Sequence, residues 1–102
     1  MGPVEAIEAA LKDFESARKR VKKVTSRQVT RADNLDHLRS TGYAWFRTYR
    51  PILDGTLAVS SLSRVDEPLQ VVLDATSRAS SKSTYVAALI EAKAALGLLR
   101  SE

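Results

Sequence analysis

The sequence contains no cysteine, a single histidine and only four glycines. The absence of cysteine excludes disulfides, thiolate-bound zinc, iron–sulfur clusters and a cysteine nucleophile. One histidine leaves almost no room for a histidine-ligated metal site, and the glycines are too few for a glycine-rich phosphate loop. These absences remove most metal- and nucleotide-dependent chemistry, so we expect no metal and no other cofactor.

Long hydrophobic runs are also missing. The longest stretch without a charged residue covers residues 55–63, which is too short and too rich in serine to span a bilayer. The N-terminus has no basic region followed by an apolar one, as a secretory signal would have. We therefore expect a cytoplasmic protein without a transmembrane segment. Its 102 residues correspond to one domain, so residues 1–102 are expected to form a single helical domain, alone or as part of a longer protein.

The apolar residues follow a helical period. They recur in steps of three and four in four segments. The first covers residues 3–24, and the second begins between 30 and 33 and ends near 49. The third covers residues 67–78, and the fourth begins at 81–83 and ends at about 100. No alternation typical of a strand extends over a useful length. Short connections favour antiparallel neighbours. The sequence therefore predicts an all-α fold, a small up-down bundle of four or five helices.

Capping residues and prolines set the expected ends of these helices. Thr30 is expected to cap the second helix, and Pro51 is expected to kink that helix or end it near Tyr49. Asp66 is expected to cap the third helix, which places Pro68 in the first turn, where its missing N–H costs little. A short helix is expected to precede this one.

Positive charge is concentrated in one part of the chain. Residues 1–50 carry eleven basic and six acidic side chains, whereas residues 51–102 carry five and six. Residues 18–31 contain no acid, and such a cluster is typical of a surface that binds a polyanion or an acidic partner. The alternative is a solvated helix end, where cations complement the helix dipole. The basic residues expected to bind are Arg18, Lys19, Lys22, Lys23, Arg27 and Arg31, and Arg20 lies among them.

Four of the six aromatic residues lie between positions 43 and 49, where Arg47 and Arg50 accompany them. Trp45 and Tyr49 continue the apolar face of the second helix and are expected in the core. Tyr43 and Phe46 lie on the flanking faces. Exposed aromatics beside arginines can stack on bases or form the centre of a protein interface. The candidate interface residues are Tyr43, Phe46, Arg47 and Arg50.

Arg31 and His37 are separated by five residues. This spacing resembles the Arg-x4–6-His signature of HEPN ribonucleases, which are small helical bundles. The resemblance implies that the arginine and the histidine of two protomers meet at a dimer cleft and cleave RNA without a metal. Ala32 stands where that family usually has a polar residue, and the motif opens the second helix rather than a late one. The alternative is an exposed histidine beside Asp33 and Asp36.

These features favour a non-catalytic interaction domain that docks on a protein partner or associates with itself. Several apolar residues lie off the main helical faces, and exposed apolar patches mark contact surfaces. They are Leu57, Val59, Leu62, Val71, Val86, Ile90 and Leu98. The alternative is a nucleic-acid-binding domain that contacts the phosphate backbone through residues 18–31. A HEPN-like ribonuclease is the third hypothesis.

Overall fold

A computed structural model describes residues 1–76 and 82–100. Four helices form the bundle: α1 (Pro3–Lys23), α2 (Ala32–Ala44), α4 (Val59–Leu73) and α5 (Lys82–Leu99). A 3-10 turn, η1 (Gln28–Thr30), connects α1 to α2, and a π-helical turn, η2 (Trp45–Tyr49), leads from α2 into the short helix α3 (Arg50–Leu53). The predicted all-α bundle is confirmed.

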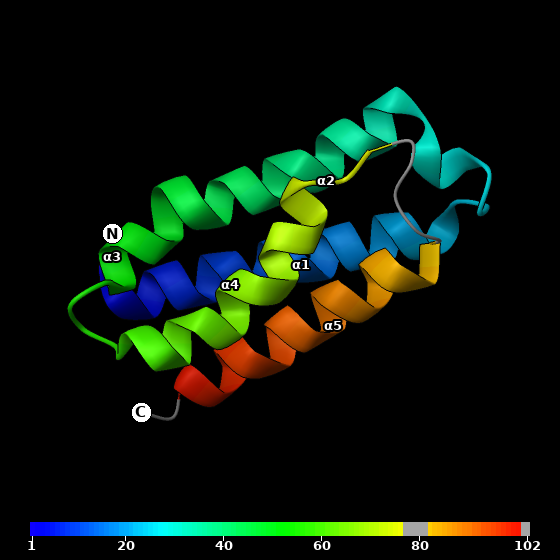
Figure 1. The fold of residues 1–102 in the computed structure, drawn as a ribbon. Helices are drawn as coiled ribbons and strands as arrows, with labels where there is room; N and C mark the ends of the chain where they lie inside the picture. The colour runs from blue at the N-terminus through cyan, green and yellow to red at the C-terminus, as the bar shows by residue number, and fades with distance from the viewer. Residues whose placement is uncertain (77–81, 101–102) are drawn as a thin grey trace.

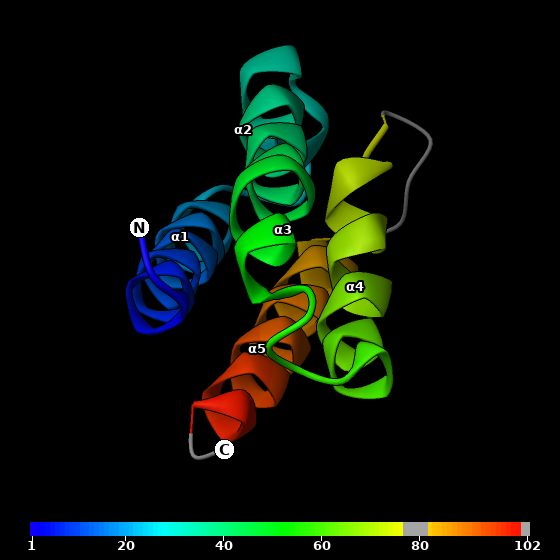
Figure 2. The same ribbon diagram turned by 90° about the vertical axis from the view of Figure 1, so that its left-hand side faces the viewer.

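The four helices run alternately up and down around one core (Figures 1 and 2). Seen along the bundle, α1 lies opposite α4 and α2 lies opposite α5, so that each helix packs against two neighbours. The molecule is elongated, with extents of 40 × 21 × 20 Å. The C-terminal end of α1, η1, the start of α2 and the start of α5 all gather at one end of the bundle (Figure 1).

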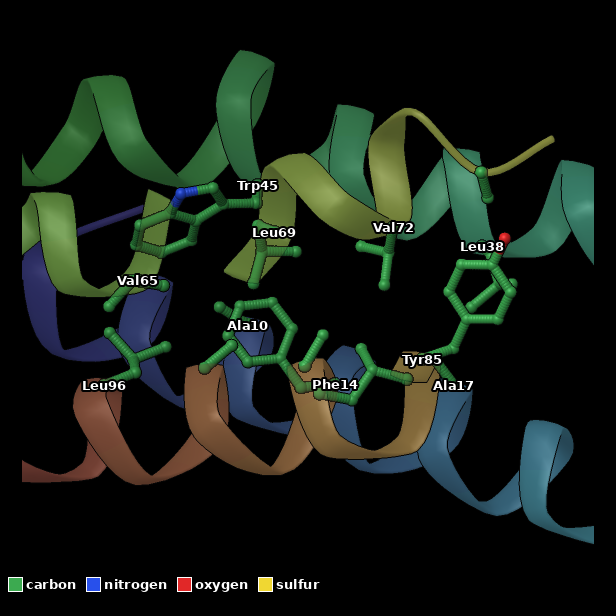
Figure 3. Close-up of a cluster of buried hydrophobic side chains, with 14 of the residues drawn as sticks. Ala10, Phe14, Ala17, Leu38, Trp45, Val65, Leu69, Val72, Tyr85 and Leu96 are labelled. Carbon is green, nitrogen blue, oxygen red and sulfur yellow. The ribbon is translucent and has the colours of Figure 1, made fainter. Parts of the chain in front are cut away.

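The core is built from the periodic apolar residues. In α1 the buried positions include Ile7, Phe14 and Val21, which recur every seven residues and so lie on one face. The Phe14 ring meets the Trp45 ring edge to face, with 5.9 Å between centroids. Figure 3 shows these rings among the buried side chains of α4 and α5. As expected, Trp45 is fully buried, whereas Tyr49 is half-buried.

Of the two outcomes expected at Pro51, a kink or an end near Tyr49, the end near Tyr49 is wrong. The helical stretch continues past Tyr49 and ends at Leu53. The π turn accommodates Pro51: the Arg50 N–H bonds to the Trp45 carbonyl, five residues back, and Pro51 then occupies the first turn of α3. A proline there has no intrahelical bond to lose. Asp54 and Gly55 form the expected stop, and Gly55 adopts a φ of +87°, which glycine tolerates without strain.

The third helix was also predicted incorrectly. Residues 59–73 form one helix, α4, with Pro68 in its interior, rather than a short helix followed by a second from 67. A proline inside a helix costs about 3 kcal/mol. Burying four apolar side chains contributes about 6–12 kcal/mol, which outweighs that cost. The buried side chains are Leu62, Val65, Leu69 and Val72. The helix ends at Leu73, with Asp74 at its C-cap, rather than at the predicted residue 78. Of the two caps expected for the last helix, Ser83 lies inside α5 and position 81 lies outside the described residues.

Two predicted caps have other roles. Thr30 lies in η1 and its hydroxyl donates to the Arg27 carbonyl, while Arg31 stands at the N-cap of α2. Asp66 lies inside α4 and accepts hydrogen bonds from Trp45 and Arg50. Local sequence favours a capping role for such residues, but for Asp66 the partner lies 21 positions away in the chain, which no local pattern indicates.

Candidate functional site

The predicted basic residues lie together at one end of the bundle. Their positions are the last two turns of α1, the connection through η1 and the start of α2. Five of them have exposed side chains, and we call these five residues the basic end. They are Lys19, Lys22, Lys23, Arg27 and Arg31.

The basic end has no acidic partner in the part of the chain that the structure describes. Arg18 differs from its neighbours, because its Nε donates to Glu15 at 3.0 Å. Lys93 of α5 binds the same carboxylate at 2.9 Å. Hydrogen bonds from Arg18 and then Lys93 lower the pKa of Glu15 from 4.5 to about 2. Arg18 therefore belongs to an ion-paired cluster, although the sequence predicted it in the binding set.

The connection between α1 and α2 is held by its own hydrogen bonds. The Thr25 hydroxyl accepts the Gln28 N–H, and the Gln28 side chain accepts the Thr25 N–H, at 3.2 and 3.1 Å. This reciprocal pair has the form of a capping box. Asn34 of α2 donates to the Gln28 carbonyl at 2.6 Å and accepts from Arg20 at 3.3 Å. These bonds fix the backbone that carries Arg27 and Arg31 relative to α1.

A groove runs along each side of the C-terminal half of α1. The groove toward α2 has a volume of about 540 Å³ and is lined by Ser16, Lys19, Arg20, Lys23, Val24 and Asn34. The groove toward α5 has a volume of about 430 Å³. Arg18, Lys22 and Lys82 line its sides together with the apolar Val86 and Ile90. Five of the six residues that line the first groove are polar or charged, whereas two apolar side chains of α5 line the second together with its cations.

Sequence reasoning missed Lys82, Val86 and Ile90 as partners of the basic cluster. They recur every four residues and so lie along one face of α5. The Lys82 ammonium donates to the Lys22 carbonyl at 2.6 Å, near the C-terminal end of α1, where a cation complements the helix dipole. The four-residue spacing was visible in the sequence, but the side-by-side placement of α1 and α5 was not.

The candidate aromatic interface is divided by the fold. Phe46 is half-buried and packs on the core. The Arg50 Nε donates to Asp66 at 2.8 Å, and the indole N–H of Trp45 donates to the same carboxylate at 2.8 Å. Only Tyr43 and Arg47 are exposed, with the guanidinium 4.5 Å from the ring centroid. Arg50 thus stabilises the fold, while Tyr43 and Arg47 remain on the surface.

His37 is half-buried and faces α1, which corrects the expectation of an exposed histidine. It lies in a depression of about 170 Å³ lined by Asp13, Ser16, Ser40 and Thr41. Burial, and then the charge of Arg20, lower the pKa of His37, while Asp13 acts in the opposite direction. Asp36, expected beside it, pairs with Arg39. Arg31 does not line this depression.

The apolar residues that lie off the main helical faces divide into a buried and an exposed group. Leu62 is fully buried, and Leu57 and Val86 are partly buried against the core. The exposed members are Val59, Val71, Ile90 and Leu98. They lie on α4 and α5, and of these four only Ile90 adjoins the basic cluster.

Residues 1–76 and 82–100 contain no group of three or more histidine, aspartate or glutamate side chains that could hold a metal ion. None of the helices in the same described residues is both long and apolar enough to cross a membrane. Comparison of the chain with protein-family models, curated proteins and solved structures finds no match.

Proposed function

We propose that this protein is a non-catalytic interaction domain whose basic end docks on an acidic surface of a partner protein. One observation carries the proposal: five exposed cations gather at one end of the bundle, with no acidic partner among the residues described. Uncompensated like charges repel one another and do not stabilise a fold. They do accelerate the encounter with an oppositely charged partner.

The ordered connection supports the same proposal. Arg27 and Arg31 flank a 3-10 turn held by the Thr25–Gln28 pair and by Asn34. A partner that binds there does not have to order this backbone, so less of the binding free energy is lost to conformational entropy.

The non-catalytic part of the proposal rests on the positions of Arg31 and His37. Arg31 is exposed at the start of α2, whereas His37 faces α1 and shares its depression with Asp13 and small hydroxyl side chains. Within one protomer, the two side chains therefore do not share a cleft.

A second candidate function is binding of a nucleic-acid backbone. The groove between α1 and α2 favours it, because three cations, Lys19, Arg20 and Lys23, line it. Such side chains would neutralise phosphates and release counterions. Against it, Tyr43 is the one exposed aromatic in the described residues, and it lies on α2, away from η1 and the end of α1.

Fluorescence anisotropy across a salt series tests both candidates. The probes are a labelled polyglutamate peptide and a labelled RNA duplex. The test variant carries Lys19→Gln, Lys22→Gln and Lys23→Gln. The matched control carries Lys12→Gln, Arg47→Gln and Arg64→Gln, which removes the same charge from exposed positions elsewhere.

We expect the wild type to bind polyglutamate, the test variant to lose about tenfold or more in affinity, and the control to lose much less. Tighter binding of RNA, with a log–log salt slope of about −3 to −5 for four or five contacted phosphates, would favour the second candidate instead. Equal losses in both variants, or no binding to either probe at low salt, would overturn the assignment of the basic end.

A further inference from the structure

The groove between α1 and α5 is distinguished by two apolar side chains of α5 that line it together with its cations. Ile90 is 50% exposed, and Val86 beside it is only partly covered. Both line the groove with Arg18, Lys22 and Lys82. Figures 1 and 2 show α1 and α5 side by side.

We infer that this groove binds an acidic amphipathic helical segment of the partner, an inference that rests on the proposed function. Lys82, Val86 and Ile90 form a row on α5, and Arg18 and Lys22 form a row on α1. Each step of four residues rises about 6 Å, so the α5 row extends over about 12 Å, or two turns of an incoming helix. Two apolar side chains spaced i, i+4 would cover Val86 and Ile90.

The charge distribution along the groove determines where the acidic residues of the segment would lie. Arg18 is already balanced by Glu15, which also holds Lys93. Lys22 and Lys82 have no acidic partner in the described chain, and the Lys82 ammonium is held at the Lys22 carbonyl. The surplus charge therefore lies at the η1 end of the groove. Carboxylates of the segment would meet these lysines, while its apolar residues would lie over Val86 and Ile90.

The apolar surface favours a protein segment over a nucleic acid in this groove. A phosphate backbone gains nothing from contact with Val86 and Ile90, whereas buried apolar area contributes to binding in proportion to its extent. The cations at the η1 end select acidic segments among amphipathic ones. A groove with both an apolar pair and cations at one end matches an acidic amphipathic helix better than a small anion such as phosphate.

The test compares two labelled peptides of identical composition. In the first, two leucines stand i, i+4 among glutamates and helix-forming alanines, and in the second the same residues are scrambled. We expect the amphipathic peptide to bind wild-type protein about tenfold more tightly than the scrambled one. Ile90→Ser should abolish this difference, whereas Leu98→Ser, at a more exposed apolar site outside the groove, should preserve it.

The outcomes separate this inference from the proposed function. Equal binding of both peptides that is lost in the Lys19→Gln, Lys22→Gln, Lys23→Gln variant would overturn the groove inference and leave the proposed function standing. Absence of binding by both peptides and by polyglutamate would overturn both. A preference for the amphipathic peptide that survives Ile90→Ser and disappears in Leu98→Ser would place the segment elsewhere and contradict the inference.

Discussion

The bundle uses its arginines and lysines in two different ways. Near the junction of η2, α3 and α4, Arg50 is held by Asp66, and the same carboxylate accepts the indole N–H of the buried Trp45. At the basic end, Lys19, Lys22 and Lys23 have no such partner in the described chain and project into solvent. In the first region charge fixes the position of a core side chain, and in the second it contributes little to the fold.

This difference separates structural from functional charge. A cation that pairs with a fixed carboxylate, such as Arg18 or Arg50, is used in an ion pair of the folded state. The unpaired cations carry an energetic cost through mutual repulsion, which a partner of opposite charge would relieve. The comparison therefore predicts large stability effects around Asp66 and large binding effects at the basic end.

The largest loss of stability is expected for Asp66→Ala. It removes the acceptor of the Trp45 indole N–H, which is buried, and of the partly buried Arg50 guanidinium. Leaving these donors unpaired should lower the free energy of unfolding by about 2–4 kcal/mol, measured by urea denaturation. Asp66→Asn keeps an acceptor for the indole and should cost less. Equal stability of wild type and Asp66→Ala would show that the carboxylate is not structural.

Gly42→Ala is expected to have the next largest effect. A Cβ at Gly42 would lie 2.8 Å from the Leu73 Cβ, because α2 and α4 approach closely there. Overpacking of this kind costs about 1–3 kcal/mol. Gly97→Ala is the matched control: nothing lies within 4 Å of its Cβ, so helix propensity should raise stability by up to about 1 kcal/mol. The same change in the two helices should thus have opposite signs in thermal unfolding.

A smaller effect on stability is expected when Lys19, Lys22 and Lys23 are all changed to Gln. Surface substitutions usually change stability within about 0.5 kcal/mol each, and here the lost dipole interaction opposes the relieved repulsion. The sharper readout is salt dependence. Salt screens repulsion among exposed cations, so added salt should stabilise the wild type more than the variant. An equal salt response would mean that the basic end carries no surplus repulsion.

His37 should give a modest dependence of stability on pH. Burial and Arg20 lower its pKa below 6.5 in the folded state, so the unfolded chain binds the proton more readily. The stabilising contribution is then present above pH 6.5 and is lost as the pH falls from 6.5 through the lowered pKa. Unfolding measured above and below this range should show the loss in wild type and a reduced loss in His37→Gln. An unchanged loss in the variant would assign it to other groups.

The ion pairs of Glu15 with Arg18 and Lys93 are tested by the pKa of the Glu15 carboxyl. Its carboxyl should titrate with a midpoint at about pH 2, against an ordinary value of 4.5, as followed by NMR. Since its folded pKa is depressed, its contribution to stability is lost as pH falls from 4.5 toward 2. Arg18→Gln should raise the midpoint more than Lys93→Ala, because the Arg18 hydrogen bond is the larger cause. The reverse order would contradict the pairing.

Much of this architecture could be predicted from the sequence because it is local. The spacing of Ile7, Phe14 and Val21 indicates a helix and its buried face without reference to any other segment. The same holds for the charge of residues 18–31, which follows directly from composition. The ends of α2 and α4 could not be predicted locally, because the π turn before Pro51 and the interior position of Pro68 depend on packing between helices.

The candidate site was predictable only in part, for a similar reason. Lys19, Lys22 and Lys23 were identified from one segment, and their exposure follows from the apolar face of that same helix. The separation of Arg18 and Arg50 from the unpaired set depends on Glu15, Lys93 and Asp66, whose pairing is a tertiary property. Lys82 and Ile90 joined the site only because α5 packs beside α1.

The central claim is that the unpaired cations form a binding surface, and chemical-shift mapping tests it most directly. Isotope-labelled protein would be titrated at low salt with the acidic amphipathic peptide. The account predicts shifts concentrated at residues 19–31 and 82–90, with little change around Asp66 and Tyr43. Shifts spread evenly over the bundle, or concentrated on α4, would contradict it.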